Sequence, residues 1–287
     1  MATLIIGSTG LLGRALVAQW PQNAVVATSS VQLDIRDNSA VTALAGKLRP
    51  EWIILAAAYT DVDGCELNPE LAFAVNARGA ENVARATRDC GSRLMFISTD
   101  YVFDGSASSP YEETARKSSI CVYGASKSAG EDRILQVLPE ACIVRTSWLF
   151  GIAGKCFPNT ILSLAATREE IQVVHDQRGS PTWNRDLARA ISELIRRNAS
   201  GIYHVTNSGD CTWFEFARAI LGGHGYRTIV HPISTDDSKR PARRPRYSVL
   251  SHKKLNELGI YMPHWREALA AYSSQLSPAQ AVAVGGR

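Results

Sequence analysis

The chain has 287 residues, of which 45% are hydrophobic and 20% charged, the profile of an ordinary soluble globular protein. Its net charge of +4 is too small to indicate nucleic acid or a membrane surface as a partner. The six cysteines form no Cys-x-x-Cys pair, no basic leader is present, and no apolar stretch approaches the roughly 18 residues of a membrane span. We therefore expect reduced thiols, no membrane segment and a cytoplasmic location.

The N-terminal segment is predicted to bind a dinucleotide. An apolar strand at residues 4–6 leads through a Gly-x-x-Gly-x-x-Gly loop into a helical pattern at 14–20. Such a loop permits a tight turn, close approach of the backbone to a pyrophosphate and close packing of the helix, whose N-terminus favours phosphate. The alternative is a purely structural turn. The loop residues expected at the cofactor are Gly7, Thr9, Gly10, Leu11, Leu12 and Gly13.

The second strand is expected at residues 24–27. No acid stands at its end, where Thr28, Ser29 and Ser30 occupy the position of the carboxylate that usually binds the ribose hydroxyls of NAD. This favours a cofactor with a 2′-phosphate, and Arg36 is the nearest candidate cation. Asp34 is expected either to hydrogen-bond the adenine edge or to cap the following helix. The cofactor-binding residues predicted here are Ser29, Asp34 and Ile35.

The run of apolar residues at 52–58 predicts a parallel strand buried on both faces. The small residues at its end leave room for a cofactor, which assigns Ala57, Ala58 and Tyr59 to its site. A helix is expected at about 71–90 and a further strand at 93–98. Thr99 then lies at the carboxyl end of a central strand, where open α/β sheets bind ligands. Its hydroxyl is expected to bond either a substrate oxygen or the local backbone.

Tyr123 and Lys127 are four residues apart on a helix expected to run to about residue 138. They therefore share a face of that helix, and the ammonium is expected to lower the pKa of the phenol. A Tyr-x-x-x-Lys spacing also occurs by chance in many helices. The next strand is expected at 141–146. The repeated strand–helix units predict a doubly wound parallel Rossmann sheet in residues 1–147.

Shorter, mixed elements after residue 148 predict a smaller α/β substrate lobe in residues 148–274, with elements that can interleave with the first domain. Helices are expected at 157–170, 186–197 and 214–221, and strands at 171–175, 202–205 and 228–231. Five cations stand within residues 239–246 and are either a solvated basic loop or a diphosphate site, for which Arg240 and Arg243 are the candidates. Residues 275–287 have no period and are expected to be a disordered tail.

With these residues in place, the chain resembles the extended short-chain dehydrogenase/reductase superfamily. Longer strings narrow the resemblance to the dTDP-4-dehydrorhamnose reductases. These strings are Ser-Thr-Asp-Tyr-Val-Phe-Asp-Gly at 98–105, Pro-Tyr-Glu at 110–112, Arg-Thr-Ser-Trp at 145–148 and Val-His-Asp-Gln-Arg-Gly-Ser-Pro-Thr at 174–182. The similarity extends from about residue 3 to about residue 270.

The resemblance implies reduction of the C4 ketone of dTDP-4-dehydro-β-L-rhamnose to dTDP-β-L-rhamnose, with NADPH, or NADH, as cofactor. By this resemblance, Tyr123 protonates the forming alkoxide and also contacts the cofactor. Lys127 lowers the pKa of Tyr123 and holds the nicotinamide ribose, and Thr99 polarises the carbonyl. The same resemblance places three residues at the sugar: Val62, Tyr101 and Trp148.

The sequence departs from the family pattern in one respect, and there are three alternatives to the implied function. The metal-bridged dimer of some family members needs acidic residues, but Arg14 and Ala15 stand in the first helix, so we expect a homodimer at most and no metal. A 4,6-dehydratase is disfavoured because Tyr101 follows Asp100 where that chemistry needs a glutamate. A reductase or an epimerase of another nucleotide-linked 4-keto sugar is an alternative. So is a non-catalytic subunit similar to the regulatory subunit of methionine adenosyltransferase.

Overall fold

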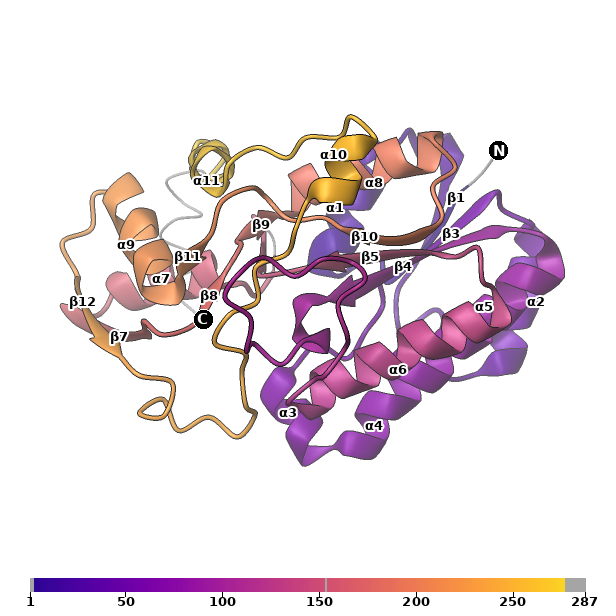
Figure 1. Cartoon of the computed structure of the whole chain (residues 1–287). Coiled ribbons are helices and arrows are strands. Elements are labelled where there is room, and N and C mark those ends of the chain that lie inside the picture. Colours follow the sequence, from indigo (N-terminus) through magenta and orange to yellow (C-terminus); the bar gives the residue numbers. More distant parts are fainter. Residues whose placement is uncertain (1–2, 153, 277–287) are drawn as a thin grey trace.

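A six-stranded parallel sheet organises the larger part of the chain in the computed structural model, which describes residues 3–152 and 154–276 (Figure 1). From edge to edge its strands are β10 (Gly201–His204), β5 (Cys142–Thr146), β4 (Arg93–Thr99), β3 (Trp52–Leu55), β1 (Thr3–Ile6) and β2 (Val25–Thr28). All neighbours are parallel, so the loops after the strands gather at one edge of the sheet. The predicted doubly wound parallel sheet is confirmed.

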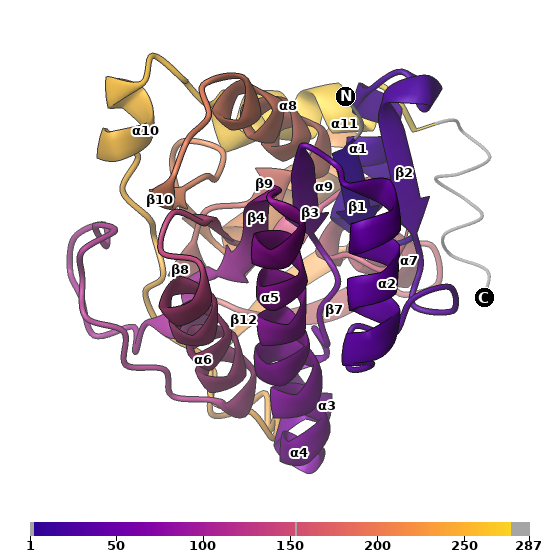
Figure 2. The same cartoon turned by 90° about the vertical axis from the view of Figure 1, so that its right-hand side faces the viewer.

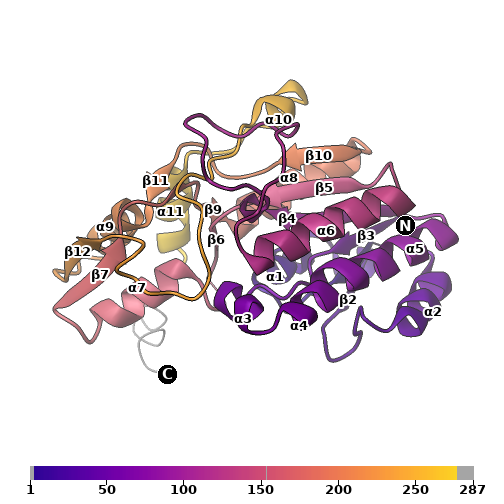
Figure 3. The same cartoon turned by 60° about the horizontal axis from the view of Figure 1, so that its bottom comes forward.

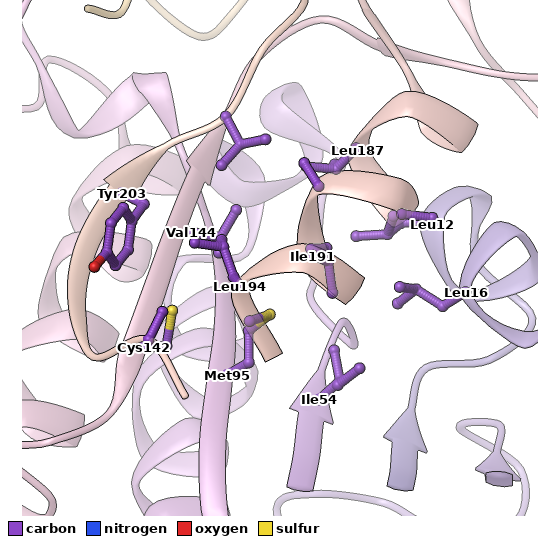
Figure 4. Packing of buried hydrophobic residues seen from close by; sticks show 14 of the residues in the cluster. Leu12, Leu16, Ile54, Met95, Cys142, Val144, Leu187, Ile191, Leu194 and Tyr203 are labelled. Atoms are coloured by element: carbon purple, nitrogen blue, oxygen red, sulfur yellow. The ribbon is translucent and has the colours of Figure 1, made fainter. Parts of the chain in front are cut away.

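Helices cover both faces of this sheet (Figure 2). One face carries α2 (Asn38–Leu48), α5 (Ala80–Cys90) and α6 (Val122–Val137), and the other carries α1 (Leu11–Gln19) and α8 (Asn184–Arg196). Burial on both faces explains the continuous apolar runs of the strands. On the second face, Leu12 and Leu16 of α1 pack with Leu187 and Ile191 of α8 over Ile54 of β3 (Figure 4).

The helix predicted at 71–90 is interrupted. It consists of α4 (Pro69–Phe73), a π-helical segment (Ala74–Gly79) and α5, and a short helix, α3 (Val62–Leu67), precedes it. Helix α6 lies so close to the π-helical segment that a Cβ at Gly130 would be 2.3 Å from the carbonyl oxygen of Asn76. π-Helical turns often mark functional sites. Here the turn directs the Asn76 side chain toward the loop after β3 and toward α6.

The second lobe contains short strands and helices of 9 to 11 residues beside the carboxyl edge of the sheet (Figure 1). Its elements are β6 (Leu149–Phe150), α7 (Phe157–Ala165), β7 (Glu170–Val174), β8 (Arg178–Gly179), β9 (Thr182–Trp183), β11 (Cys211–Thr212), α9 (Trp213–Gly223), β12 (Ile229–Ile233) and α11 (Trp265–Ser273). The strand predicted at 202–205 does not belong to this lobe. It is β10, which together with α8 returns to the large sheet.

A connecting segment, residues 239–251, runs from the second lobe back to the sheet and leads to the short helix α10 (Lys253–Glu257). Its backbone exchanges hydrogen bonds with Arg178 of β8 on one side and with Tyr111 on the other, at 2.7–2.9 Å. Figure 3 shows this segment passing between the second lobe and α3. The basic run therefore belongs to the segment that connects the two lobes, close to the carboxyl edge of the sheet.

A buried ion pair joins α6 to the sheet beneath that edge. Both guanidinium nitrogens Nε and Nη2 of Arg145 donate to the Glu131 carboxylate, at 3.0 and 2.7 Å, and neither side chain is more than 1% exposed. Ser98 donates to the same carboxylate at 2.5 Å, and Lys117 lies 3.3 Å from it. This satisfies the buried charges, as a stable buried pair requires. Arg145 also contacts Nε2 of His204 at 3.3 Å.

His204 makes the stability of this region depend on pH. Its Nδ1 lies 3.1 Å from the carbonyl oxygen of Tyr111, so Nδ1 carries the proton and Nε2 accepts from Arg145. Burial, with the charge of Arg145, lowers the pKa of His204 to about 3. Between pH 6.5 and 3 the unfolded chain therefore binds more protons than the folded one. The free energy of unfolding should fall by about 1.4 kcal/mol per pH unit in this range from this group.

Urea titrations of the wild type and of His204→Gln between pH 7 and 4 measure that contribution. The variant is expected to lose stability less steeply than the wild type as the pH falls. His231→Gln, on the exposed strand β12, controls for the loss of one histidine from the chain. Equal slopes for His204→Gln and the wild type would show that His204 is not the titrating group.

Candidate active site

The glycine loop between β1 and α1 has the geometry predicted for a phosphate loop. Gly7 has φ +95°, and a Cβ there would lie 2.5 Å from the backbone nitrogen of Ala57. A Cβ at Gly13 would lie 2.1 Å from the carbonyl oxygen of Gly7, so α1 packs directly on the turn. Gly10 is the N-cap of α1 and provides no side-chain cap, which leaves the first amide groups of the helix available to an anion.

The other predicted cofactor residues lie at the same edge of the sheet. Ser29 follows β2, and the partly exposed Ala57, Ala58 and Tyr59 follow β3. Two predicted residues do not face that edge freely. Ile35 is 3% exposed and packs at Gly79, and the Asp34 carboxylate accepts three hydrogen bonds from Arg36. Asp34 does not cap the following helix either, because Asp37 is the N-cap of α2.

Asn76, which the sequence reasoning missed, connects the end of β3 to the helix of Tyr123. Its side chain accepts a hydrogen bond from the amide of Tyr59 (2.8 Å) and donates to the carbonyl of Tyr59 (3.0 Å) and to the hydroxyl of Ser126 (3.0 Å). Ser126 in turn donates to the carbonyl of Tyr123 at 2.7 Å. Asn76 is 1% exposed, so these bonds fix the spacing between the two elements. The one feature of the sequence that points to Asn76 is a polar residue among the apolar positions of the helical pattern.

Thr99 ends β4, which extends past β3 toward the second lobe. Its hydroxyl donates to Oδ1 of Asp100 at 3.0 Å and accepts from the amide of Tyr101 at 3.2 Å. The hydroxyl must therefore rotate before it can donate to a ketone. Asp100 is 2% exposed, and burial raises its pKa to about 6 against the hydrogen bonds that it accepts from Ser248 and Thr99.

Tyr123 stands in the first turn of α6, with its ring edge-on to that of Tyr101 at 5.7 Å. Burial raises the pKa of Tyr123, while hydrogen bonding with Thr99 opposes the shift. The nearby Asp100, Cys65 and Cys121 raise the pKa further. This direction is opposite to the one predicted, because desolvation outweighs any stabilisation of the phenolate. The phenol is thus protonated at neutral pH, the form that a proton donor needs.

Lys127 lies one turn further along α6 and is 1% exposed. Its ammonium donates to the carbonyl of Ile97 on β4 at 2.7 Å and lies 3.9 Å from the ring centre of Phe96. Burial lowers the pKa of Lys127 to about 7, and the Glu131 carboxylate one turn beyond opposes this shift. Lys127 is consequently close to its protonation midpoint at neutral pH, where a small change in its surroundings changes its charge.

An aromatic pair from the second lobe faces this edge. Trp148, with φ +46°, stacks on Trp213 of α9 with ring centres 3.5 Å apart and planes within 6° of parallel. The absence of a side chain at Gly179 makes room for the indole of Trp148, which a Cβ there would approach to 2.6 Å. The sequence pointed to Trp148 but not to Trp213, since the two are brought together only by the folding of the lobe.

The basic run is anchored by an acid that the sequence reasoning missed. Asp63 of α3 accepts hydrogen bonds from Arg244 (2.9 Å), Arg240 (3.3 Å) and the amide of Ala242 (3.1 Å). Burial alone would raise the pKa of Asp63, but these bonds and charges hold it below its usual range. Arg243 is exposed and pairs with no acid in residues 3–152 or 154–276. Of the two predicted arginines, only Arg240 is thus paired with Asp63. Val62 precedes Asp63 in α3.

Within the described ranges, no helix is long and apolar enough to cross a bilayer. The same ranges hold no group of three histidine, cysteine, aspartate or glutamate side chains arranged to bind a metal ion.

Known proteins are similar to this chain over nearly its whole length. The chain is 39% identical to a dTDP-4-dehydrorhamnose reductase of Mycobacterium tuberculosis, over 99% of this chain and 95% of that protein. It is 41% identical to a dTDP-4-keto-6-deoxy-D-glucose reductase of Streptomyces niveus, over 93% of this chain and 94% of that one. The crystal structure of a dTDP-4-dehydrorhamnose reductase of Bacillus anthracis in complex with NADP superposes with a TM-score of 0.92. It is 41% identical and covers 95% of this chain and 99% of its own.

These findings confirm the resemblance on which the prediction of a nicotinamide-dependent oxidoreductase rested. The family model described as the RmlD substrate binding domain matches residues 1–277. The chain therefore belongs to the RmlD substrate binding domain family, in agreement with the resemblance carried by the longer strings between residues 98 and 182.

Proposed function

We propose that the protein reduces the C4 ketone of dTDP-4-dehydro-β-L-rhamnose to dTDP-β-L-rhamnose, with NADPH as the preferred cofactor and NADH as an alternative. The arrangement of Thr99, Tyr123 and Lys127 at the end of β4 carries the proposal. A ketone accepts a hydride at carbon and a proton at oxygen, and a protonated phenol supplies the second.

Tyr123 is the proton donor in this scheme. Its raised pKa keeps the proton in place until negative charge develops on the ketone oxygen. Thr99, after its hydroxyl rotates away from Asp100, donates to the same oxygen and stabilises that charge. Lys127, whose ammonium donates to the carbonyl of Ile97, would hold the ribose of a bound cofactor, and its positive charge would stabilise the phenolate left behind.

The residues of the glycine loop and of the strand ends fit a dinucleotide. The uncapped N-terminus of α1 and the close turn at Gly7 suit the pyrophosphate. The small, partly exposed residues Ala57 and Ala58 leave room for the nicotinamide half. A bound reduced nicotinamide supplies the hydride for the ketone.

The sugar nucleotide is proposed to lie between this edge and the second lobe. Tyr101, Trp148 and Val62 line the sugar in this scheme. The rigid stacking of Trp148 on Trp213 supports its assignment, because a fixed indole orients a sugar at little entropic cost. Arg240 and Arg243, on the connecting segment, are proposed to bind the diphosphate.

A second candidate substrate is the 4-keto-6-deoxyglucose nucleotide, favoured by the 41% identity to the Streptomyces niveus reductase. The purified protein should be assayed with both dTDP-linked 4-keto sugars, each with NADPH and NADH, by the loss of absorbance at the reduced nicotinamide. We expect turnover with dTDP-4-dehydrorhamnose and faster turnover with NADPH. Preference for the other sugar would favour the second candidate. No turnover with any pair would leave the non-catalytic alternative.

We further propose the division into a dinucleotide domain (1–147) and an interleaving substrate lobe (148–274), supported by the separate apolar core around α7 and α9. Residues 277–287 of the proposed tail (275–287) lie outside the described residues.

A cytoplasmic location is supported by six free cysteines, five of them buried. A homodimer is supported by the exposed Leu67 and Leu71 on neighbouring helices, and light scattering after size exclusion tests it.

A further inference from the structure

The carboxyl end of β2 decides whether a dinucleotide with or without a 2′-phosphate is preferred, because the adenosine ribose binds there in doubly wound folds. In this chain the amides of Gly7 and Ser8 both donate to the carbonyl of Thr28 at 2.9 Å. The glycine loop and the end of β2 therefore meet, and Ser8 lies beside the ribose position. No acid stands between Val25 and Leu33 to repel a phosphate.

Arg36, the cation nearest in sequence, is already neutralised. Its Nε lies 2.9 Å from both carboxylate oxygens of Asp34, and its Nη2 lies 2.5 Å from Oδ2. An arginine in such a bidentate pair must break it before it can bind a phosphate. The prediction that Arg36 would serve this role therefore loses its support.

Arg14 of α1 is the better-placed cation. Its Nε donates to the carbonyl of Thr9 at 2.9 Å, which holds the base of the guanidinium against the glycine loop. Its terminal nitrogens make no hydrogen bond or ion pair with the residues that the structure describes (3–152, 154–276). The side chain lines a surface groove of about 460 Å³ together with Ser8 and Ala27, and Val17, Ala18 and Trp20 form its apolar wall.

We propose that Arg14, with the hydroxyl of Ser8, binds the 2′-phosphate of NADPH in this groove and so gives the protein its preference for NADPH over NADH. The planar guanidinium offers two free nitrogens to two phosphate oxygens. Because its Nε is already held, the side chain loses little conformational freedom on binding. The inference rests on the proposed dinucleotide site and not on the identity of the sugar.

Calorimetric titration with adenosine 2′,5′-bisphosphate and with adenosine 5′-monophosphate tests this assignment, since the two probes differ only in the 2′-phosphate. Arg14→Gln is expected to weaken binding of the bisphosphate about tenfold or more and that of the monophosphate less than about twofold. Ser8→Ala should weaken the bisphosphate alone by about threefold, and Arg14→Lys should retain part of the affinity. The double variant Asp34→Asn/Arg36→Gln, which removes both charges of that ion pair, is the control, and in it the ratio of the two affinities should be unchanged.

Three results would overturn the proposal. These are an equal loss for both probes in Arg14→Gln, no loss for either, or a selective loss of the bisphosphate in Asp34→Asn/Arg36→Gln. Neither probe contains a nicotinamide or a sugar nucleotide. The binding result can therefore be interpreted even if the protein has no reductase activity.

Discussion

Tyr123→Phe is expected to lower kcat by about 10²- to 10⁴-fold, the usual range for loss of a positioned general acid. The ring and its edge-on contact with Tyr101 remain, so only the proton is removed. Because the pKa of the phenol is raised, the wild type carries that proton through the neutral range. Steady-state rates with dTDP-4-dehydrorhamnose and NADPH measure the effect.

Binding of NADPH, followed by its fluorescence, should stay within about threefold of the wild type in this variant, since one hydroxyl contact contributes little to a large ligand. Tyr203→Phe removes a hydroxyl from a buried tyrosine of β10 in the same sheet and is the matched control. It should leave kcat nearly unchanged. A parallel loss of NADPH binding and kcat in Tyr123→Phe would assign Tyr123 to cofactor binding alone, and a normal kcat would remove it from the reaction.

Glu131→Gln is expected to lower the free energy of unfolding by about 3–5 kcal/mol, because it leaves the buried guanidinium of Arg145 without its counter-charge. Burial alone would raise the pKa of Glu131, but the hydrogen bonds and charge of Arg145, together with Lys117, hold it below its usual range. This stability is therefore complete above the unfolded pKa of a glutamate and is lost as the pH falls through the lower folded value. Urea unfolding at pH 7 measures the difference.

Glu81→Gln is the matched control, since Glu81 also pairs with two arginines, Arg85 and Arg133, but on the surface of α5. Its effect should stay below about 1 kcal/mol. Glu131→Gln should also lower the pKa of Lys127, because the Glu131 carboxylate is the charge that opposes the effect of burial on that lysine. Similar losses of stability in the two variants would show that the pair beneath the site is no stronger than a surface pair.

The parts of the site that lie within one strand–loop–helix unit could be predicted from the sequence. Glycine spacing at 7–13 indicated the phosphate loop because its requirement is local, a positive φ at Gly7 and space at Gly13. Thr99 was predictable in position because it ends a strand of a parallel sheet, whereas Trp148 was assigned through the family resemblance alone. The strand order then brings these loops to one edge without further information.

The parts that depend on contacts between distant segments could not be predicted. Asn76 acts through a π-helical turn that no periodicity reveals, and Trp213 reaches Trp148 only through the packing of α9. The partners of the basic run were hidden for the same reason, since Asp63 is nearly 180 residues away in sequence. The pKa of Tyr123 is raised, whereas the sequence predicted that it would be lowered. The reason is that residue spacing reveals the nearby lysine but not the desolvation of the phenol.

We expect a hydride to reach C4 of a dTDP-linked 4-keto sugar while Tyr123 protonates its oxygen. Incubation of the wild type with dTDP-4-dehydrorhamnose and NADPH deuterated at C4 of the nicotinamide, as the separate R and S isomers, tests this by NMR of the product. The expected result is dTDP-rhamnose with deuterium at sugar C4 from one isomer, and about 10²- to 10⁴-fold slower labelling in Tyr123→Phe. Product without deuterium at C4 from either isomer, or no product at all, would contradict it.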